Sequence, residues 1–305
     1  MRDLAVFFEH PAWFAPLFAK LDARGFDWAP LSIQDHVFEL AAPPPARVVF
    51  NRLAMSSIGR QVEHGLFHVL AALDAWEGAG ARVINGVRPL AYDLSKARQL
   101  ALFRRVGLVT PRTLVAHRRQ DVPAMAAEIG YPVIVKANIG GSGAGVARYD
   151  SADELRDAVH AGETPMGVDG VVLVQDYIPA RDGRVIRCEL LAGEFLYAIA
   201  LDGAGSTFDL CPADVCLADR PSITVSAFHP PEAIRTAVRR TGDLATLDLG
   251  GIEYLIDDRD GRPKFYDFNA MSNFVASPHE VLGFDPYDDL ADFLEAEIAA
   301  ARAPA

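Results

Sequence analysis

The stretch Y-P-V-I-V-K-A-N-I-G-G-S-G-A-G-V, from Tyr131 to Val146, decides the fold class of this sequence. It begins with an apolar, β-branched run that is typical of a buried strand, and Lys136 interrupts that run. Four glycines follow within six residues, so the loop can fold its backbone N–H groups around an anion. Residues 146–149 then predict a return strand. The stretch is therefore predicted to be a hairpin with a cation at its base and a polyphosphate as its ligand.

Two better-known phosphate loops do not match this stretch. A P-loop requires a lysine directly after its last glycine, and this sequence has Val146 there. A dinucleotide-binding fingerprint requires G-x-G-x-x-G between a strand and a helix, whereas Gly141 begins G-x-G-x-G and a strand is predicted to follow. One alternative stays open from the stretch alone, namely a flexible hairpin whose lysine reaches out to solvent.

Composition limits the function classes that fit this chain. It has 305 residues, of which half are hydrophobic, and this is enough for two or three domains with a large core. The formal net charge of -12 argues against binding to nucleic acids or to anionic membranes. No run approaches the roughly 18 apolar residues of a membrane span, and residues 1–4 do not begin a signal peptide. The cysteines are odd in number and widely spaced, so we expect a reducing, cytoplasmic location.

Alternating strands and helices predict a small N-terminal α/β domain with a mostly parallel sheet. The predicted order is β-α-β-β-α-β, and the domain is expected to cover residues 1–90. Its strands are predicted at 4–8, 28–33, 47–51 and 82–85, with 37–40 as a further short candidate, and its helices at 11–24 and 61–76.

A change in composition near Pro89 marks the start of the larger part of the chain. Residues 93–106 predict one amphipathic helix, and the lysine hairpin follows it. We expect a central lobe over residues 91–175 and a C-terminal lobe over residues 176–305. Residues 202–231 are long for a loop and have weak periodicity, so they are a candidate for a segment that covers a substrate.

Three oxygen-bearing side chains are predicted to converge near the end of the chain. Glu253 lies in G-I-E-Y-L-I, and Asp267 and Asn269 lie in F-Y-D-F-N-A, with the turn signal D-D-R-D-G-R between the two strands. Asp267 and Asn269 are two residues apart, so they share one face of a strand. Oxygen ligands without His or Cys suit Mg²⁺, which phosphates and water usually complete. The alternative is that these residues form a solvated face of the hairpin. Their apolar neighbours argue against this alternative.

These motifs, in this order, resemble the ATP-grasp superfamily and, within it, the RimK-type carboxylate–amine ligases. The resemblance covers about residues 84–275. Lys96, in I-N-G-V-R-P-L-A-Y-D-L-S-K, matches the first nucleotide-binding lysine, and Lys136 matches the second, followed by the glycine-rich flap. The strand V-Q-D-Y-I, residues 174–178, is similar to the hinge whose backbone meets adenine. Arg187, in D-G-R-V-I-R-C-E, matches an arginine that contacts phosphate.

The resemblance implies an α/β protein with α+β lobes, an ATP-grasp fold preceded by an open α/β domain. It implies ATP and Mg²⁺ or Mn²⁺ as cofactors, and it assigns catalytic roles to Arg187 and Lys136. The residues implied for nucleotide binding are Lys96, Lys136, Gly141, Ser142, Gly143, Gln175, Asp176, Tyr177, Ile178, Asp182 and Phe268. The residues implied for the metal are Glu253, Asp267 and Asn269.

The resemblance further implies an ADP-forming ligation through an acylphosphate. A substrate carboxylate attacks the γ-phosphate, and an amine then attacks the acyl carbon and releases phosphate. The implied partners are small-molecule carboxylate and amine substrates, such as an amino acid or a small peptide of a biosynthetic pathway. Arg52 follows a parallel strand, where open sheets bind ligands, so it is a candidate for reading a substrate carboxylate. Ser272 and Asn273, just past the metal strand, are further candidates for the acyl substrate.

Some positions depart from the family's pattern, and other outcomes stay open. The family usually has Glu where Asp267 stands and often Asp where Glu253 stands. Its ribose-contacting acid falls near Ala180, for which Asp182 is a substitute. An ATP-grasp enzyme that cyclises or phosphorylates its substrate is an alternative, as is a non-catalytic ATP-binding regulatory module. The sequence also leaves a homodimer open.

Overall fold

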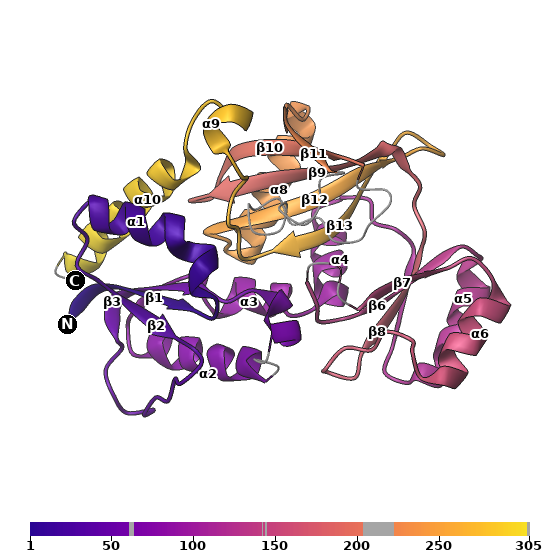
Figure 1. Ribbon diagram of the computed structural model, residues 1–305, viewed down its shortest axis with the longest axis horizontal. Coiled ribbons are helices and arrows are strands. Elements are labelled where there is room, and N and C mark those ends of the chain that lie inside the picture. The colour runs from indigo at the N-terminus through magenta and orange to yellow at the C-terminus, as the bar shows by residue number, and fades with distance from the viewer. Residues whose placement is uncertain (61–63, 142, 144, 204–222, 304–305) are drawn as a thin grey trace.

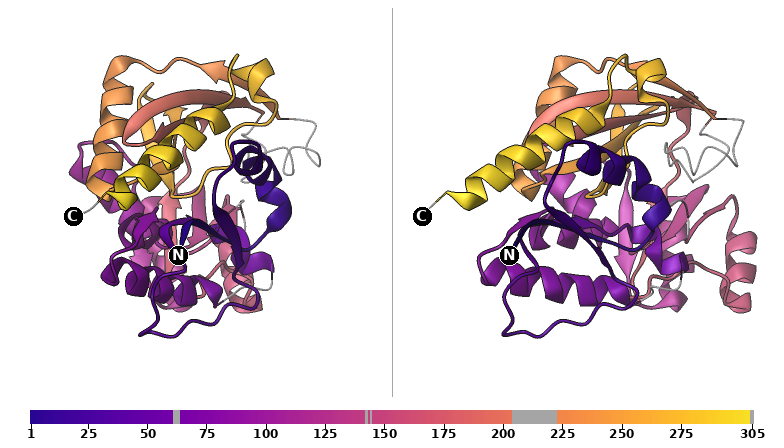
Figure 2. Two further views of the ribbon diagram at one scale, coloured as in Figure 1. Left: turned by 90° about the vertical axis from the view of Figure 1, so that its left-hand side faces the viewer. Right: turned by 60° about the vertical axis from the view of Figure 1, so that its left-hand side comes forward.

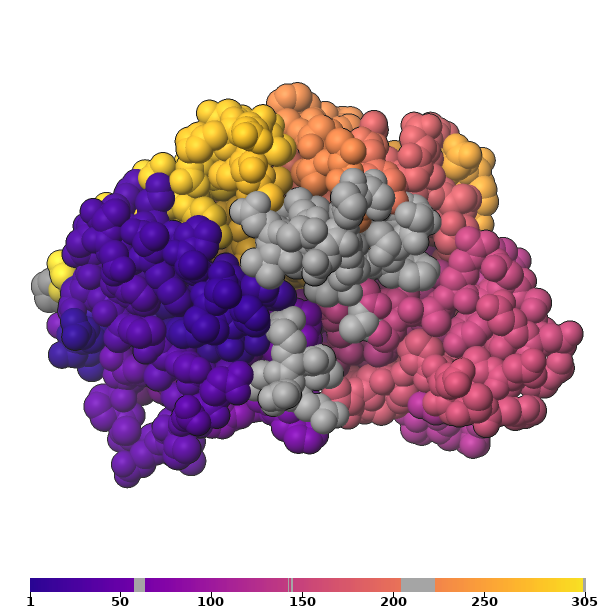
Figure 3. All heavy atoms as spheres, viewed as in Figure 1, coloured from indigo at the N-terminus to yellow at the C-terminus, as the bar shows by residue number. Residues whose placement is uncertain are grey.

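The computed structural model describes residues 1–60, 64–141, 143, 145–203 and 223–303, with only the backbone of residues 58–60. Figure 1 shows three sheets: one in the N-terminal part at the left, one in the central lobe at the right, and one in the C-terminal lobe above. Figure 3 shows the same three regions on the surface of one face. The arrangement confirms the predicted mixed α/β class.

The N-terminal part is built on a four-stranded parallel sheet in the order β2-β1-β3-β4. In the register, Phe8 lies opposite Arg52, so β1 and β3 end side by side. The parallel sheet predicted from the alternation of strands and helices is therefore confirmed. Its strands are β1 Arg2–Phe8, β2 Trp28–Ser32, β3 Ala46–Arg52 and β4 Arg82–Ile84.

Helices on both faces bury this sheet. The helices are the 3-10 turns η1 Pro11–Phe14 and η2 Met55–Arg60, and the α-helices α1 Ala15–Ala23 and α2 Gly65–Gly78. The strand predicted at residues 37–40 is wrong, because these residues pair with no neighbouring strand. Val37 and Leu40 are 89% and 80% exposed, so their apolar character does not mark a buried strand.

Residues 87–105 form two helices where one was predicted over 93–106. They are α3 Val87–Asp93 and α4 Lys96–Arg105. Ser95 causes the break, because its backbone is extended and its side chain accepts a hydrogen bond from the backbone N–H of Arg98. Serine is a favoured N-cap for this reason. The cap makes Lys96 the first residue of α4, with its side chain directed into the protein.

The central lobe is an antiparallel sheet in the order β5-β8-β6-β7, with helices packed on its outer face (Figure 1). Lys136 on β6 pairs with Val146 on β7, which confirms the hairpin predicted from the sequence. The strands are β5 Thr113–Ala116, β6 Val133–Ala137, β7 Val146–Tyr149 and β8 Val172–Asp176. The helices are η3 Arg119–Asp121, α5 Val122–Ile129 and α6 Ala152–Ala161.

The C-terminal lobe is an antiparallel sheet in the order β11-β10-β9-β12-β13, against which α4 and α8 pack. Glu253 on β12 lies opposite Asp267 on β13, as the sequence predicted for a paired hairpin. The elements are β9 Ala180–Leu191, β10 Glu194–Asp202, β11 Thr224–Phe228, α8 Glu232–Ala245, β12 Leu249–Asp257 and β13 Pro263–Asn269.

The last helices return to the N-terminal part of the chain. After α9 Pro278–Val281, α10 Pro286–Arg302 packs against α1 and β3. Figure 2 shows α10 lying across the N-terminal part, close to the first strand. One hydrophobic core joins Val6 and Phe50 of the N-terminal sheet to Ile199 of the C-terminal sheet and Leu294 of α10. None of the described helices is both long enough and apolar enough to span a membrane.

Candidate functional site

Lys96 is paired with a predicted metal ligand. Its Nζ lies 2.8 Å from Oδ1 of Asp267, and both side chains are mostly buried. Burial alone lowers the pKa of Lys96, but the neighbouring Asp267 outweighs it, so the pKa stands above its usual value. The other oxygen of Asp267, Oδ2, accepts a hydrogen bond of 3.1 Å from Nδ2 of Asn269. The start of α4 therefore meets the end of β13 through a charged contact.

A second buried pair joins Arg187 on β9 to Glu253 on β12. Arg187 Nη1 donates to Glu253 Oε1 over 2.9 Å, and Tyr266 Oη donates to Glu253 Oε2 over 3.1 Å. Arg187 Nε also donates to Oε1 of Glu189, which is fully buried. Because the two carboxylates outweigh the effect of burial, the pKa of Arg187 stands above its usual value. Sequence reasoning missed Glu189, although its spacing of two from Arg187 on one strand places both on one face.

The chemistry of the donor set fits a hard divalent cation. Burial, and then the nearby Asp267, raise the pKa of Glu253, so these carboxylates repel each other. A dication between them would relieve that repulsion, and Asn269 adds an amide oxygen on the same strand. Among the described residues no three His, Cys, Asp or Glu side chains form a metal cluster. Mg²⁺ held here would therefore need phosphate oxygens and water to complete its shell.

Lys136 is a buried cation without a hydrogen bond or ion pair to the described residues. Its side chain points from β6, and the residue is 6% exposed. Burial, and then the nearby Lys96, lower the pKa of Lys136 to about 7, although Asp267 opposes the shift. An isolated buried ammonium is costly, and a bound anion would restore its charged form. This environment suits a phosphate group.

Asn138 ties the two lysines together, and sequence reasoning did not identify it. Its backbone carbonyl accepts from the backbone N–H of Lys96 over 3.0 Å. Its side-chain oxygen accepts from the Ala97 N–H over 3.0 Å and from the Ser95 hydroxyl over 3.1 Å. Since Asn138 follows Lys136 by two residues, it fixes the start of α4 against the end of β6. The only sequence signal was a polar residue directly after an apolar strand.

Asp93 is a second side chain that sequence reasoning missed. Its Oδ2 accepts a hydrogen bond of 3.0 Å from the backbone N–H of Ala270, directly after the predicted metal ligand Asn269. Burial, and then the nearby Asp267, raise the pKa of Asp93 to about 7. The carboxyl group therefore anchors the end of β13 from the end of α3.

The glycine-rich flap touches the N-terminal part of the chain. A Cβ atom on Gly141 would lie 2.9 Å from the backbone nitrogen of Ser56, so only glycine fits this close approach. Gly143 has a φ of +72°, a conformation that favours glycine. Ser142, predicted to bind the nucleotide, and residues 204–222 of the predicted covering segment lie outside the described residues.

The predicted hinge residues follow one another where the central and C-terminal lobes meet. Gln175 is buried and donates to Thr113 Oγ1 over 2.8 Å. Asp176 accepts from Arg259 over 2.8 Å. The Arg148 guanidinium lies 4.1 Å from the ring centre of Tyr177.

The remaining residues implied for the nucleotide have different surroundings. Ile178 is buried beside the hinge. Asp182 has a φ of +57° on an exposed bend of β9. Phe268 is fully buried in the core of the C-terminal lobe, where its ring faces Tyr92. The assignment of these three residues to nucleotide binding stays a prediction.

The three residues predicted to contact the acyl substrate lie together. Arg52 is fully buried, with its guanidinium 5.0 Å from the ring centre of Phe14 and 4.9 Å from that of Phe50. Its Nη2 donates to the carbonyl oxygen of Ser272 and, over 3.0 Å, to Oδ1 of Asn273. The fold thus brings the end of β3 against the segment that follows β13.

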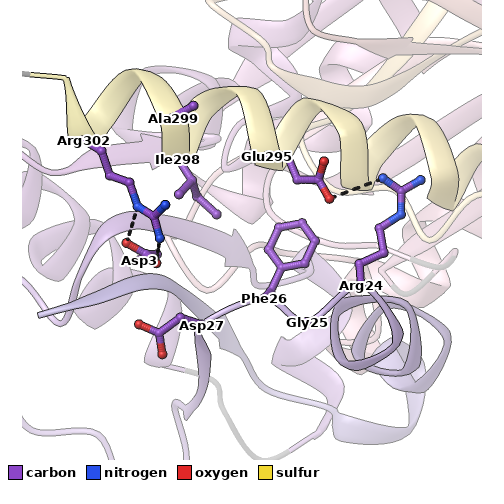
Figure 4. Close-up of a pocket in the computed structure, with 9 residues that line it drawn as sticks. All are labelled: Asp3, Arg24, Gly25, Phe26, Asp27, Glu295, Ile298, Ala299 and Arg302. Carbon is purple, nitrogen blue, oxygen red and sulfur yellow. Dashed lines mark hydrogen bonds and ion pairs between the residues drawn. The ribbon is translucent and has the colours of Figure 1, made fainter.

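A separate pocket of about 270 Å³ lies between α10 and the N-terminal sheet and holds none of the predicted site residues (Figure 4). Four of its charged side chains pair with one another, because Arg302 binds Asp3 and Arg24 lies 3.5 Å from Glu295. It is lined by Asp3, Arg24, Gly25, Phe26, Asp27, Glu295, Ile298, Ala299 and Arg302.

Comparison with known proteins identifies relatives of this chain. The model of the RimK-like ATP-grasp domain matches residues 93–208. A probable alpha-L-glutamate ligase 1 of Pseudoalteromonas atlantica is 30% identical over 143 residues, which are 47% of this chain and 46% of that protein. The match thus spans about half the length of that relative. A probable alpha-L-glutamate ligase of a Picosynechococcus species is 25% identical over 234 residues, 76% of this chain and 73% of that protein.

Solved structures share the fold. The ATP-grasp ligase PsnB, complexed with minimal precursor, Mg and ADP, superposes with a TM-score of 0.67 at 20% identity, over 97% of each chain. Identity this low shows the fold alone. The matched domain and the shared fold confirm the family predicted from the lysines, the glycine flap and the paired carboxylate strands. Residues 93–208 of the chain match a RimK-like ATP-grasp domain, and the chain shares the fold of a solved ATP-grasp ligase.

Proposed function

We propose that this protein is an ATP-dependent, ADP-forming ligase that joins a carboxylate to an amine through an acylphosphate. The observation that carries the proposal is the gathering of three cations, Lys96, Lys136 and Arg187, beside the paired carboxylates of β12 and β13. Phosphoryl transfer needs chiefly positioning and neutralisation of charge, which such a set supplies. The names of the relatives, alpha-L-glutamate ligases, support an amino acid or a peptide as substrate.

In this proposal each side chain has a separate task. Lys96 and Lys136 hold the α- and β-phosphates of ATP, and the hinge backbone at residues 175–178 holds adenine. Arg187 stabilises the transferred phosphoryl group and the oxyanion that forms when the amine attacks, a role in which one donor is worth about 3–4 kcal/mol. The flap excludes water, which would otherwise hydrolyse the acylphosphate.

Glu253, Asp267 and Asn269 would hold the metal. Mg²⁺ supplies Lewis-acid charge to the phosphate oxygens when it is bound. Before it binds, Lys96 holds one oxygen of Asp267 and Arg187 holds one oxygen of Glu253, so both side chains are fixed in position. Mn²⁺ would suit the same oxygen donors.

The test is release of ADP and phosphate in the presence of MgATP, with a panel of amino acids and small carboxylates and with hydroxylamine as the amine. A hydroxamate in the same amount as ADP is expected for the true carboxylate. Lys136→Ala should abolish turnover, and Lys20→Ala, which removes a lysine on α1 far from the site, should not. ATP binding without turnover for every carboxylate would instead favour a regulatory module, and phosphorylated or cyclised product would identify the other ATP-grasp outcomes.

A further inference from the structure

Several buried polar atoms lack a hydrogen-bond partner, and three residues that carry them lie at or just after the ends of β1 and β3. They are Nδ1 of His10, Nε and Nη1 of Arg52, and Oγ of Ser57. Arg52 is the last residue of β3, Ser57 lies in η2 just after it, and His10 follows β1 by two residues. Because β1 and β3 are parallel neighbours with Phe8 opposite Arg52, all three residues lie at the same edge of the sheet.

This edge is where open parallel sheets bind ligands. Arg52 and Ser57 are both fully buried, and unpaired buried donors are rare because they lose their hydrogen bonds to water. On Arg52 only Nη2 is satisfied, by the two acceptors of the Ser272–Asn273 segment. No carboxylate of the described residues forms an ion pair with Arg52. Its pKa, lowered by burial to about 10, still leaves it charged at neutral pH.

The same edge borders the proposed reaction centre on two sides. Arg52 contacts Ser272 and Asn273, which follow the predicted metal ligand Asn269 by three and four residues. Gly141 of the flap approaches Ser56, the residue before Ser57, so closely that a Cβ atom would not fit. Arg52 and Ser57 therefore lie beside both the flap and the segment after β13, the two segments that border the proposed reaction centre.

We propose that Arg52 and Ser57 form a subsite for a second carboxylate of the acyl substrate, which is then a dicarboxylate or an acidic amino acid. Nε and Nη1 lie on different edges of the Arg52 guanidinium, and either can donate a charge-assisted hydrogen bond to a carboxylate oxygen. The Ser57 hydroxyl and the His10 imidazole add two further polar groups at this edge. The proposal rests on the proposed function, since it takes the other carboxylate of the same molecule to be the one that is phosphorylated.

Binding is measured first, because it needs no turnover. Thermal unfolding is followed with MgADP and either a dicarboxylate probe, called a dianion for its two carboxylates (glutarate, succinate, L-glutamate or L-aspartate), or a monocarboxylate counterpart, called a monoanion (butyrate or 4-aminobutyrate). At least one dianion should raise the melting temperature, and no monoanion should do so at the same concentration. Arg52→Lys should weaken the effective dianion at least tenfold. The control is Arg47→Lys, which lies near the opposite end of β3 and should leave it unchanged.

Ser57→Ala separates a ligand role from a structural one. The Ser57 hydroxyl has no partner, so its removal breaks no bond and should leave the melting temperature of the ligand-free protein unchanged or higher. The same change should weaken binding of the effective dianion about fivefold. Unchanged binding in both Arg52→Lys and Ser57→Ala would overturn the subsite and leave Arg52 as a cation that only joins the two parts of the chain.

Hydroxamate formation from the same probes separates this proposal from the ligase assignment. Stabilisation by a dianion that depends on Arg52 and Ser57, without any hydroxamate, would support the subsite and count against the ligase. Hydroxamate from a monoanion with equal or greater kcat/KM, unaffected by Arg52→Lys, would overturn the subsite and leave the ligase standing. Failure of all four dianions to stabilise the protein would also overturn the subsite.

Discussion

Lys96 and Asp267 neutralise each other across the site, with 2.8 Å between Nζ and Oδ1. One belongs to α4 and the other to β13, and 170 residues of chain separate them. In the proposed function, Lys96 binds phosphate and Asp267 binds Mg²⁺. In the ligand-free protein these two side chains bind each other. We therefore expect nucleotide and metal to bind together, because phosphate replaces Asp267 as the partner of Lys96, and Mg²⁺ replaces Lys96 as the partner of Asp267.

Lys96→Met is expected to impair turnover more than it impairs folding. Asp267 would lose its cation and the nucleotide would lose a phosphate contact, so turnover should fall by roughly 10²–10³-fold, as for the loss of one transition-state donor. Binding of MgATP, followed by calorimetry, should weaken in parallel. Lys264→Met, at the start of β13, is the matched control, and equal loss in both variants would show that Lys96 has no specific role.

Lys136→Met should stabilise the ligand-free protein at neutral pH. The pKa of Lys136 is lowered from 10.5 to about 7, so above pH 7 the unfolded chain binds more protons at this site than the folded one. The cost of the buried charge is therefore largest at and below pH 7 and disappears as pH rises toward 10.5. Unfolding in urea should show a gain of roughly 2 kcal/mol or more for the variant at pH 7. A gain that is as large at pH 9.5 would contradict this explanation.

Gly251→Ala should displace the Arg187 side chain, although Arg187 itself is unchanged. A Cβ atom at residue 251 would lie 2.4 Å from Nη2 of Arg187, so the guanidinium must move off Glu253. We expect turnover to fall more than tenfold and stability to fall by about 1–3 kcal/mol, the usual cost of overpacking. Gly78→Ala, where a Cβ meets nothing within 4 Å, serves as the control. Full activity in Gly251→Ala would mean that the position of Arg187 does not matter for the reaction.

Asn138→Ala should weaken ATP binding through the position of both lysines. The variant keeps the backbone contact to Lys96 but loses the side-chain bonds to Ser95 and Ala97. We expect KM for ATP to rise about tenfold, while KM for the carboxylate changes little. A change in melting temperature with no change in either KM would assign the residue to folding alone.

Acid should destabilise the N-terminal part through His36. Its Nδ1 lies 2.9 Å from Nε2 of His68, and burial, then the nearby His68, lower its pKa below 6.5. The unfolded chain therefore takes up the proton first. The stabilising contribution is complete above pH 6.5 and is lost as pH falls toward the folded-state pKa. His36→Phe should flatten the fall in unfolding free energy between pH 7 and 5, and His117→Gln, at an exposed histidine, is the control variant.

Local signals were enough to predict the strands that carry the site. The hairpin of Lys136 was readable from a β-branched run followed by glycines, and the pairing of Glu253 with Asp267 from the turn between their strands. The parallel N-terminal sheet followed from the alternation of its elements. For each hairpin the deciding information lies within about 20 residues of sequence, whereas the sheet required the alternation over residues 1–90.

Contacts between distant segments were not readable in this way. The contacts of Asp93 with Ala270 and of Asn138 with α4 depend on how distant segments meet, and no single segment encodes that. The segment at 37–40 was misread for the same reason, because a strand exists only where a neighbour pairs with it. Ser95 was a local signal that was overlooked, since an N-cap serine inside an amphipathic run begins a new helix.

The return of α10 to the N-terminal part sets the order in which this protein can mature. The faces of α1 and β3 that α10 covers belong to the first quarter of the chain, whereas α10 is made after nearly all of it. On the ribosome the first sheet must therefore wait, with apolar surface uncovered, until residues 286–302 emerge. The Arg302–Asp3 ion pair then joins the end of α10 to β1. Chaperones that bind apolar surface on nascent chains would therefore bind this sheet before α10 is made.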